Sequence, residues 1–117
     1  MAKYFEELEI WQMAKGISIL IYQQFMSCRD FRFRDQIQSA AVSVMNNIAE
    51  GFERRKGSKE FVMFLYIAKG SAGEVRSMLS LSVELGYMSK ESHAEMKERC
   101  MRLSAAIYSI IASLKSR

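Results

Sequence analysis

The stretch NNIAEGFERRKGSKEFVMFL, residues 46–65, joins two apolar helical patterns through a short basic segment. In the pattern before it, apolar and small side chains recur at helical spacing, namely Ile37, Ala40, Ala41, Val44, Ile48 and Phe52. Gly57 favours a break, and Ser58 is placed to accept a hydrogen bond from the free N–H groups of a following helix. A connection this short cannot return the chain to its starting end, so the two helices must run antiparallel. The stretch therefore predicts a helical hairpin.

Similar patterns lie on both sides of this hairpin. Amphipathic spacing predicts helices at about residues 5–27, 31–54, 58–86 and 89–115. We expect Gly86 to end the third helix in a left-handed conformation and Ser89 to cap the fourth. The sequence contains no proline, which favours long uninterrupted helices. We predict an all-α fold, an antiparallel up-down-up-down four-helix bundle that forms a single domain over residues 1–117.

The segment GSAG, residues 70–73, lies inside the third predicted helix. Its glycines lower helix propensity, so the segment is either a break or a smooth patch against which another backbone packs closely. The apolar pattern continues in phase through the segment, which favours close packing.

The chain has more apolar residues than one bundle core requires. Eight of them lie beside or behind the predicted core stripes: Ile10, Met13, Ile19, Val62, Met63, Tyr66, Ile67 and Met78. Contiguous exposed patches of this kind usually mark an interface, so we predict self-association. The alternative is that each stripe is merely broad and the extra residues are scattered.

Charge and cysteine content bound the class of protein. The formal net charge is +4, and between residues 29 and 59 seven cations stand against four anions. The excess of positive charge therefore surrounds the second helix and its exit. Cys28 and Cys100 lack metal-site spacing and are expected to be small buried hydrophobic residues. The chain starts in charged amphipathic residues and has no apolar run long enough to span a bilayer, so we expect a cytoplasmic protein.

The residue patterns that carry catalysis or bind cofactors are not found in the sequence. His93 is the only histidine and has no cysteine or carboxylate at ligand spacing. The phosphate-binding patterns GxGxxG and GxxxxGK[ST] do not occur. A serine nucleophile would need a base held beside it, and a single unoriented histidine is a poor candidate. We therefore expect no enzyme activity, no metal, no cofactor and no small-molecule substrate.

The segments FEELEIWQMAKGI, QIQSAAVSVMNNIAEGFERRKGSKEFVMFLYIAKGSAGE and LGYMS, in this order and spacing, resemble the four-helix bundle protein family. This family is also named the 23S ribosomal RNA intervening-sequence protein family. The resemblance covers nearly the whole chain. It implies a small bacterial protein that has no established enzymatic activity and tends to form homopentameric rings. The occurrence of such reading frames inside ribosomal RNA genes has prompted the idea that members bind RNA or DNA.

The family motif maps onto the junction between the second and third helices. Its positions here are Asn47, Ile48, Ala49, Glu50 and Gly51 at the end of one helix, Arg54 or Arg55 as the basic position, and Glu60, Phe61, Phe64 and Leu65 at the start of the next. We interpret these residues as a structural junction in preference to a ligand site. Relatives commonly have an arginine pair where this chain has Gln38 and Ser39, and a proline where it has Met45. The second helix should therefore be less basic on that face and straighter.

Two functional hypotheses follow. In the first, a self-assembled ring binds nucleic acid weakly and without sequence specificity, through phosphate contacts from Arg32, Arg34, Arg54, Arg55, Lys56 and Lys59. In the second, the chain is an oligomeric scaffold or protein-interaction module with no nucleic-acid role. Glu50, Glu53 and Glu60 lie among the same cations, as they would on a solvated helix end.

Overall fold

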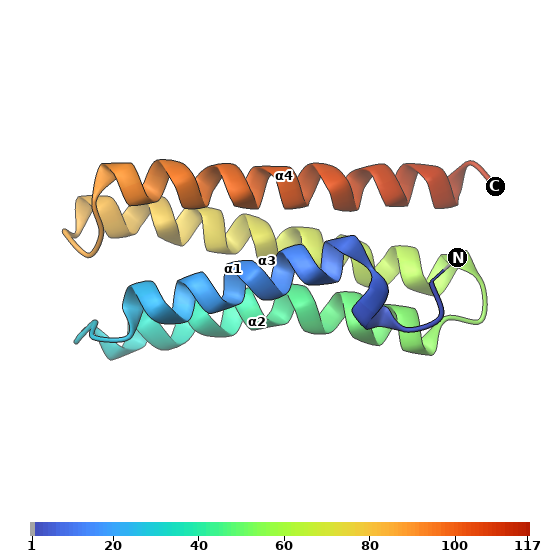
Figure 1. Cartoon of the computed structure of the whole chain (residues 1–117), viewed down its shortest axis with the longest axis horizontal. Helices are drawn as coiled ribbons and strands as arrows, with labels where there is room; N and C mark the ends of the chain where they lie inside the picture. The colour runs from blue at the N-terminus through green and yellow to red at the C-terminus, as the bar shows by residue number, and fades with distance from the viewer. Residues whose placement is uncertain (1) are drawn as a thin grey trace.

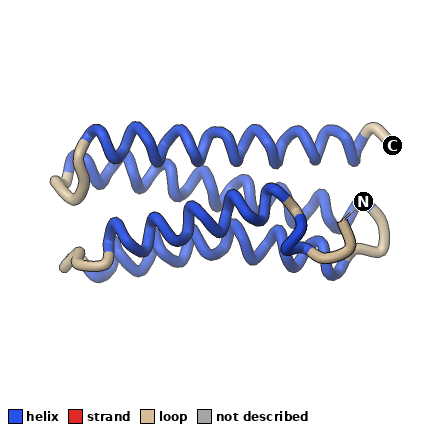
Figure 2. The backbone as a smooth tube through the Cα atoms, viewed as in Figure 1, coloured by secondary structure: helices blue, strands red, loops and turns tan. Residues whose placement is uncertain are grey.

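The computed structural model describes residues 2–117 and is all-helical there. Its elements are the 3-10 turn η1 (Phe5–Glu7) and the helices α1 (Glu9–Phe25), α2 (Phe31–Arg54), α3 (Ser58–Glu84) and α4 (Lys90–Lys115). The helices form an elongated bundle of 46 × 20 × 19 Å, with the connecting loops confined to its two ends (Figures 1 and 2). The predicted all-α four-helix bundle is confirmed.

Each helix packs against the next one along the chain. α2 lies between α1 and α3, α3 also contacts α4, and α1 touches α4 as well. The α1–α2 and α3–α4 loops lie at one end of the bundle, whereas the α2–α3 loop and both chain termini lie at the other (Figure 1). The helices therefore alternate in direction, as the short connections predicted.

One hydrophobic core runs the length of the bundle and takes side chains from all four helices. The stripe predicted for α2 is buried throughout. Of the eight apolar residues that we placed outside the core stripes, one is fully buried. Ile10 is only 2% exposed, because α1 turns apolar side chains toward both α2 and α4. On α4, Ile111 is buried, whereas Ile110 is half-buried.

The helix starts are set by local capping. The Asp30 side chain accepts a hydrogen bond from the Phe33 N–H at the start of α2, and Ser89 caps α4 in the same way through the Ser92 N–H. The prediction for Ser58 was wrong, because α3 already begins at that residue and Gly57 occupies the cap position without a side-chain acceptor. The first predicted helix is also shorter, since Leu8 is extended and separates η1 from α1.

Glycines mark one turn and one contact in the bundle. Gly86 adopts φ 78° directly after α3, as predicted from its position. By contrast, α3 runs unbroken through GSAG, and a β-carbon at Gly70 or Gly73 would meet no atom within 4 Å. The break was therefore wrong, and the two glycines make no close contact within the chain. The other two residues of the segment do pack in the bundle, because Ala72 is 2% exposed and the Ser71 hydroxyl lies 3.0 Å from that of Ser43 on α2. The close approach occurs instead at Gly51.

Among residues 2–117, no helix combines the length and the apolar character needed to cross a bilayer.

Candidate functional site: the basic end and the motif junction

The six candidate nucleic-acid contacts do not form one surface. Arg32 and Arg34 lie in the first turn of α2, whereas Arg54, Arg55, Lys56 and Lys59 surround its last turn and the following loop. At 1.5 Å per residue, Arg32 and Arg54 are about 33 Å apart along the helix axis. The sequence cluster between residues 29 and 59 is thus divided between opposite ends of the bundle.

The larger group, Arg54, Arg55, Lys56 and Lys59, is here called the basic end. Arg54 pairs with Glu50 at 2.9 Å, one helical turn earlier, at the i, i+4 spacing that favours such pairs. The Arg55 guanidinium stacks on the Phe52 ring, 3.6 Å from its centroid, and donates a hydrogen bond to the Phe52 carbonyl oxygen. Within residues 2–117, Arg55, Lys56 and Lys59 form no ion pair with a carboxylate. Their charges are therefore directed to solvent or to a ligand.

The smaller group at the start of α2 carries less uncompensated charge. Arg34 lies 3.1 Å from the Asp35 carboxylate and also stands over the Phe31 ring. Arg32 is exposed two residues from Asp30. Hydrogen bonds from the Tyr87 hydroxyl and the Phe33 N–H lower the pKa of Asp30, and the charge of Arg32 adds a smaller effect in the same direction. Carboxylates thus flank both arginines, which makes this end the weaker candidate for binding a polyanion.

Asn47 in the family motif makes a polar contact within α2. Its amide donates hydrogen bonds to the Ser43 carbonyl oxygen at 2.8 Å and to the Ser43 hydroxyl at 3.0 Å. That hydroxyl lies 3.0 Å from the Ser71 hydroxyl on α3. The asparagine therefore orients a serine pair that links the two helices.

The apolar motif residues form the contact between α2 and α3. Ile48 is fully buried, and Phe61 lies edge-on to Phe52 with ring centroids 5.8 Å apart. Gly51 is buried, and a β-carbon there would stand 2.5 Å from the β-carbon of Phe64. Only a residue without a side chain lets α3 come this close. The other motif positions, Ala49, Glu50 and Glu60, are half-buried or exposed around this contact.

A match to a family model decides the classification of the chain. The family model described as 23S rRNA-intervening sequence protein matches residues 6–109. The chain belongs to this family. A solved structure supports the architecture. It is a protein of unknown function from the S23 ribosomal protein family of Bacteroides thetaiotaomicron, with a TM-score of 0.80, 22% identity, and coverage of 87% of this chain and 97% of that chain. At this identity the likeness concerns the fold. No curated protein matches the chain.

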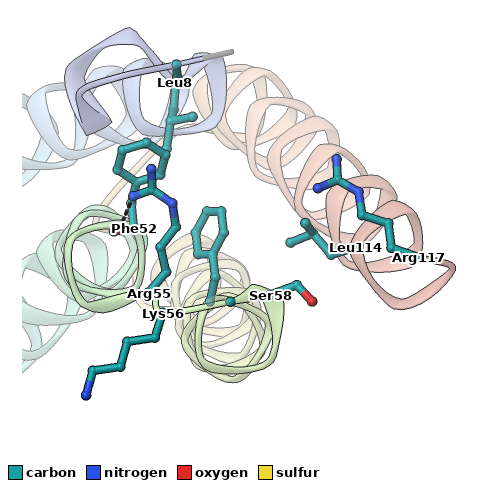
Figure 3. A pocket seen from close by; sticks show the side chains of 10 residues that line it. Leu8, Phe52, Arg55, Lys56, Ser58, Leu114 and Arg117 are labelled. Atoms are coloured by element: carbon teal, nitrogen blue, oxygen red, sulfur yellow. Dashed lines mark hydrogen bonds between the residues drawn. The ribbon is translucent and has the colours of Figure 1, made fainter.

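The structure also adds residues that the sequence did not single out. Arg117 and Leu114 at the end of α4, together with Leu8 before α1, line one pocket with Arg55 and Lys56 of the basic end (Figure 3). These residues are far apart in the sequence. The signal that could have found them is the bundle topology itself, which brings the end of α4 beside the α2–α3 loop.

Proposed function

We propose that this chain is a non-enzymatic protein that assembles with copies of itself, and that the assembly binds nucleic acid weakly and without sequence specificity through the basic end. The proposal for assembly is supported by large apolar side chains on the outer faces of the helices, each between 46% and 67% exposed. They are Ile19 and Tyr22 on α1, Met26 directly after it, Met63, Tyr66 and Ile67 on α3, and Met101 and Tyr108 on α4. Exposed apolar residues gathered in this way are typical of protein interfaces.

The strongest support for contact with a second copy of the chain comes from the outer face of α4. Its exposed residues Met101, Ala105, Tyr108 and Ala112 follow one another at the three- and four-residue spacing of a coiled-coil seam, and Ala94 lies one heptad before Met101. The buried side of the same helix already packs into the bundle core. This second seam has no use within the bundle, and its alanines would let another helix approach closely. A homopentameric ring, which the family resemblance implies, is one closed arrangement of such contacts.

Assembly is tested by measuring the molar mass in solution by light scattering across a range of protein concentrations. Ala105→Glu places a charge on the α4 seam and should shift the mass toward that of one chain. Ser113→Glu adds the same charge at an exposed position of α4 that does not belong to the seam, and it should leave the mass unchanged. A wild-type protein that has the mass of one chain at every concentration would refute assembly, and a mass near five chains would support the ring.

Nucleic-acid binding is supported by the free cations of the basic end. Arg55, Lys56 and Lys59 can neutralise phosphates, and each copy in a ring would add its set to a shared surface. Because Arg55 is held against Phe52, its guanidinium is already ordered before it meets a phosphate. Such contacts position a polyanion and read no sequence.

The division of the cations between the bundle ends supplies a matched control for the binding test. Retention of mixed-sequence RNA and duplex DNA is measured at about 50 mM salt and above, where phosphate contacts should weaken steeply as salt rises. Replacing Arg54, Arg55 and Lys56 with glutamate should abolish retention without changing the molar mass. Replacing Arg32 and Arg34 with glutamate at the opposite end should have a much smaller effect. No retention of the wild type at low salt would end the nucleic-acid proposal.

The alternative is an oligomeric scaffold with no nucleic-acid role. It is favoured by the ion pairs Arg54–Glu50 and Arg34–Asp35, which reduce the positive charge available at each end of the bundle. On this alternative, the wild type has the mass of an oligomer but retains no nucleic acid. A protein partner captured by the wild type should then also be captured by the glutamate variant of the basic end.

A further inference from the structure

A pocket of about 530 Å³ lies at the end of the bundle where α2 and α4 finish and α3 begins (Figure 3). Its size falls within the range of about 300–1,000 Å³ that is usual for small-molecule sites. The surrounding segments are the N-terminal segment before α1, the end of α2, the α2–α3 loop, the start of α3 and the end of α4. Every helix of the bundle therefore has an end at or close to this pocket.

The interior of the pocket is apolar. Phe52 and Phe61, which are 5% and 7% exposed, are among its lining residues. Leu8 and Leu114 line it from different sides (Figure 3). The two rings are held edge-on by their mutual contact. An alkyl or aryl group placed between the leucines would be removed from water on several sides, which favours binding by the hydrophobic effect.

The charged side chains that line the pocket are cationic. Arg55 and Arg117 extend their guanidinium groups along opposite sides of the pocket, whereas the Lys56 side chain points away from it (Figure 3). No aspartate or glutamate is among the residues that line the pocket. Within residues 2–117, neither arginine is in an ion pair. One hydrogen bond and the Phe52 ring fix the Arg55 guanidinium in place, which leaves its remaining N–H groups available to an anion.

The backbone adds to this preference for an anion. Gly57 and Ser58 line the pocket at the start of α3, and no side chain caps the N–H groups of its first turn. The positive end of the helix dipole therefore faces the same region as the two guanidinium groups. Backbone and side chains together select negative charge beside an apolar cavity.

We propose that this pocket binds a small amphiphilic anion, specifically a medium-chain alkyl carboxylate. The carboxylate binds at the rim between Arg55 and Arg117, and the alkyl chain lies over Phe61 between Leu8 and Leu114. The site is independent of the proposed assembly and of nucleic-acid binding, since it is built within one chain and requires an apolar tail.

The probe is octanoate, added to the full-length chain and followed by calorimetry and by backbone amide chemical shifts. We expect saturable binding, with the largest shifts at Gly57, Ser58 and Leu114. 1-Octanol lacks the charge and octylammonium reverses it, so both should bind at least about tenfold more weakly than octanoate, as expected when a charge-assisted contact is lost. Equal binding of octylammonium, or shifts confined to the outer faces of α1, α3 and α4, would overturn the proposal.

Variants distinguish octanoate binding in the pocket from general attraction by the positive charge of the basic end. Arg55→Gln combined with Arg117→Gln should weaken octanoate binding about tenfold or more. Lys59→Gln removes one charge from the same end but from a residue that does not line the pocket, and it should bind octanoate like the wild type. Leu114→Asp should abolish binding through the tail site while the arginines remain. If Lys59→Gln weakened binding as much as the arginine pair, the attraction would be general electrostatics and the proposal would fail.

Discussion

Gly51 on α2 lies directly against the side chain of Phe64 on α3, so closely that a β-carbon at position 51 would stand 2.5 Å from the Phe64 β-carbon. Other Phe64 and Phe61 atoms would lie 3.1 and 3.2 Å away. This relationship explains in physical terms why a glycine stands within the helical family motif. It fixes the distance between the two helices on either side of the basic end.

We predict that Gly51→Ala destabilises the protein. Overpacking of this kind costs about 1–3 kcal/mol, and the better helix propensity of alanine offsets up to about 1 kcal/mol of it. The net loss should be roughly 1–2 kcal/mol, measured by urea unfolding. Gly16→Ala is the matched control, because Gly16 is also inside a helix but a β-carbon there meets no atom within 4 Å. That variant should gain about 0.5–1 kcal/mol. A Gly51→Ala protein as stable as the Gly16→Ala protein would contradict the contact.

At the opposite end of the bundle, Tyr87 donates a hydrogen bond of 2.6 Å to the carboxylate of Asp30. This bond, followed by the one from the Phe33 N–H, lowers the pKa of Asp30 below its ordinary value of 3.8. The same bond raises the pKa of Tyr87 above its ordinary value of 10.0. The Asp30 contribution to stability is therefore fully present above about pH 4 and is lost as the pH falls through the folded-state pKa. The Tyr87 contribution is present below about pH 10 and is lost as the pH rises through its raised pKa.

We predict that Tyr87→Phe raises the pKa of Asp30 toward its ordinary value and lowers the urea midpoint at pH 7. The difference in midpoint from the wild type should narrow as the pH falls through the lowered pKa of Asp30, because the wild-type carboxylate then becomes protonated as well. The pKa is measured by NMR titration of the Asp30 side chain. Tyr22→Phe removes a hydroxyl from a tyrosine that is 46% exposed and should leave both quantities unchanged. An Asp30 that titrates at the same pH with and without the Tyr87 hydroxyl would show that the bond does not form.

The fold could be predicted because its determinants are local and periodic. The stripe from Ile37 to Phe52 has an unambiguous helical period, and the connection around Gly57 is too short for anything but an antiparallel return. The errors arose where the spacing of residues does not determine which way a side chain points. The direction of Ile10 depends on where α1 begins, and that start follows the extended residue Leu8. The positions of the glycines likewise do not show that Gly51 faces a neighbouring helix while Gly70 faces solvent.

The candidate site was less predictable, because charges close in sequence lie far apart on a rod-shaped bundle. Arg32 and Arg54 belong to one helix and still occupy opposite ends of the molecule. In contrast, Arg55 and Arg117 line the same pocket although most of two helices separates them in the sequence. Sequence spacing reports faces of a helix, whereas the position of a charge along the bundle follows from helix length and topology.

The two cysteines should differ sharply in reactivity. Cys100 is 1% exposed, and burial raises the pKa of its thiol to about 11, whereas Cys28 is half-buried in the α1–α2 loop. Because the thiolate is the reactive form, a disulfide reagent at pH 8 should modify Cys28 first and Cys100 only when the protein unfolds. We expect about one reactive thiol per native chain and two in strong denaturant. Cys28→Ser should abolish the fast reaction. A native Cys28→Ser protein that reacts rapidly would contradict the burial of Cys100.

The two buried serines should respond in opposite directions to removal of their hydroxyls. The Ser18 Oγ is buried in α1 and has no hydrogen-bond partner within residues 2–117. The Ser82 Oγ is also buried, but it donates to the Leu79 carbonyl oxygen at 2.7 Å. Ser18→Ala should therefore stabilise the fold by about 1 kcal/mol, because an unsatisfied polar group is removed. Ser82→Ala should destabilise it by about 0.5–1.5 kcal/mol through the lost bond. Alanine improves helix propensity by a similar amount at both positions, so the difference between the two urea midpoints isolates the hydrogen bond. Equal losses in both variants would mean that the Ser18 hydroxyl has a partner in solution.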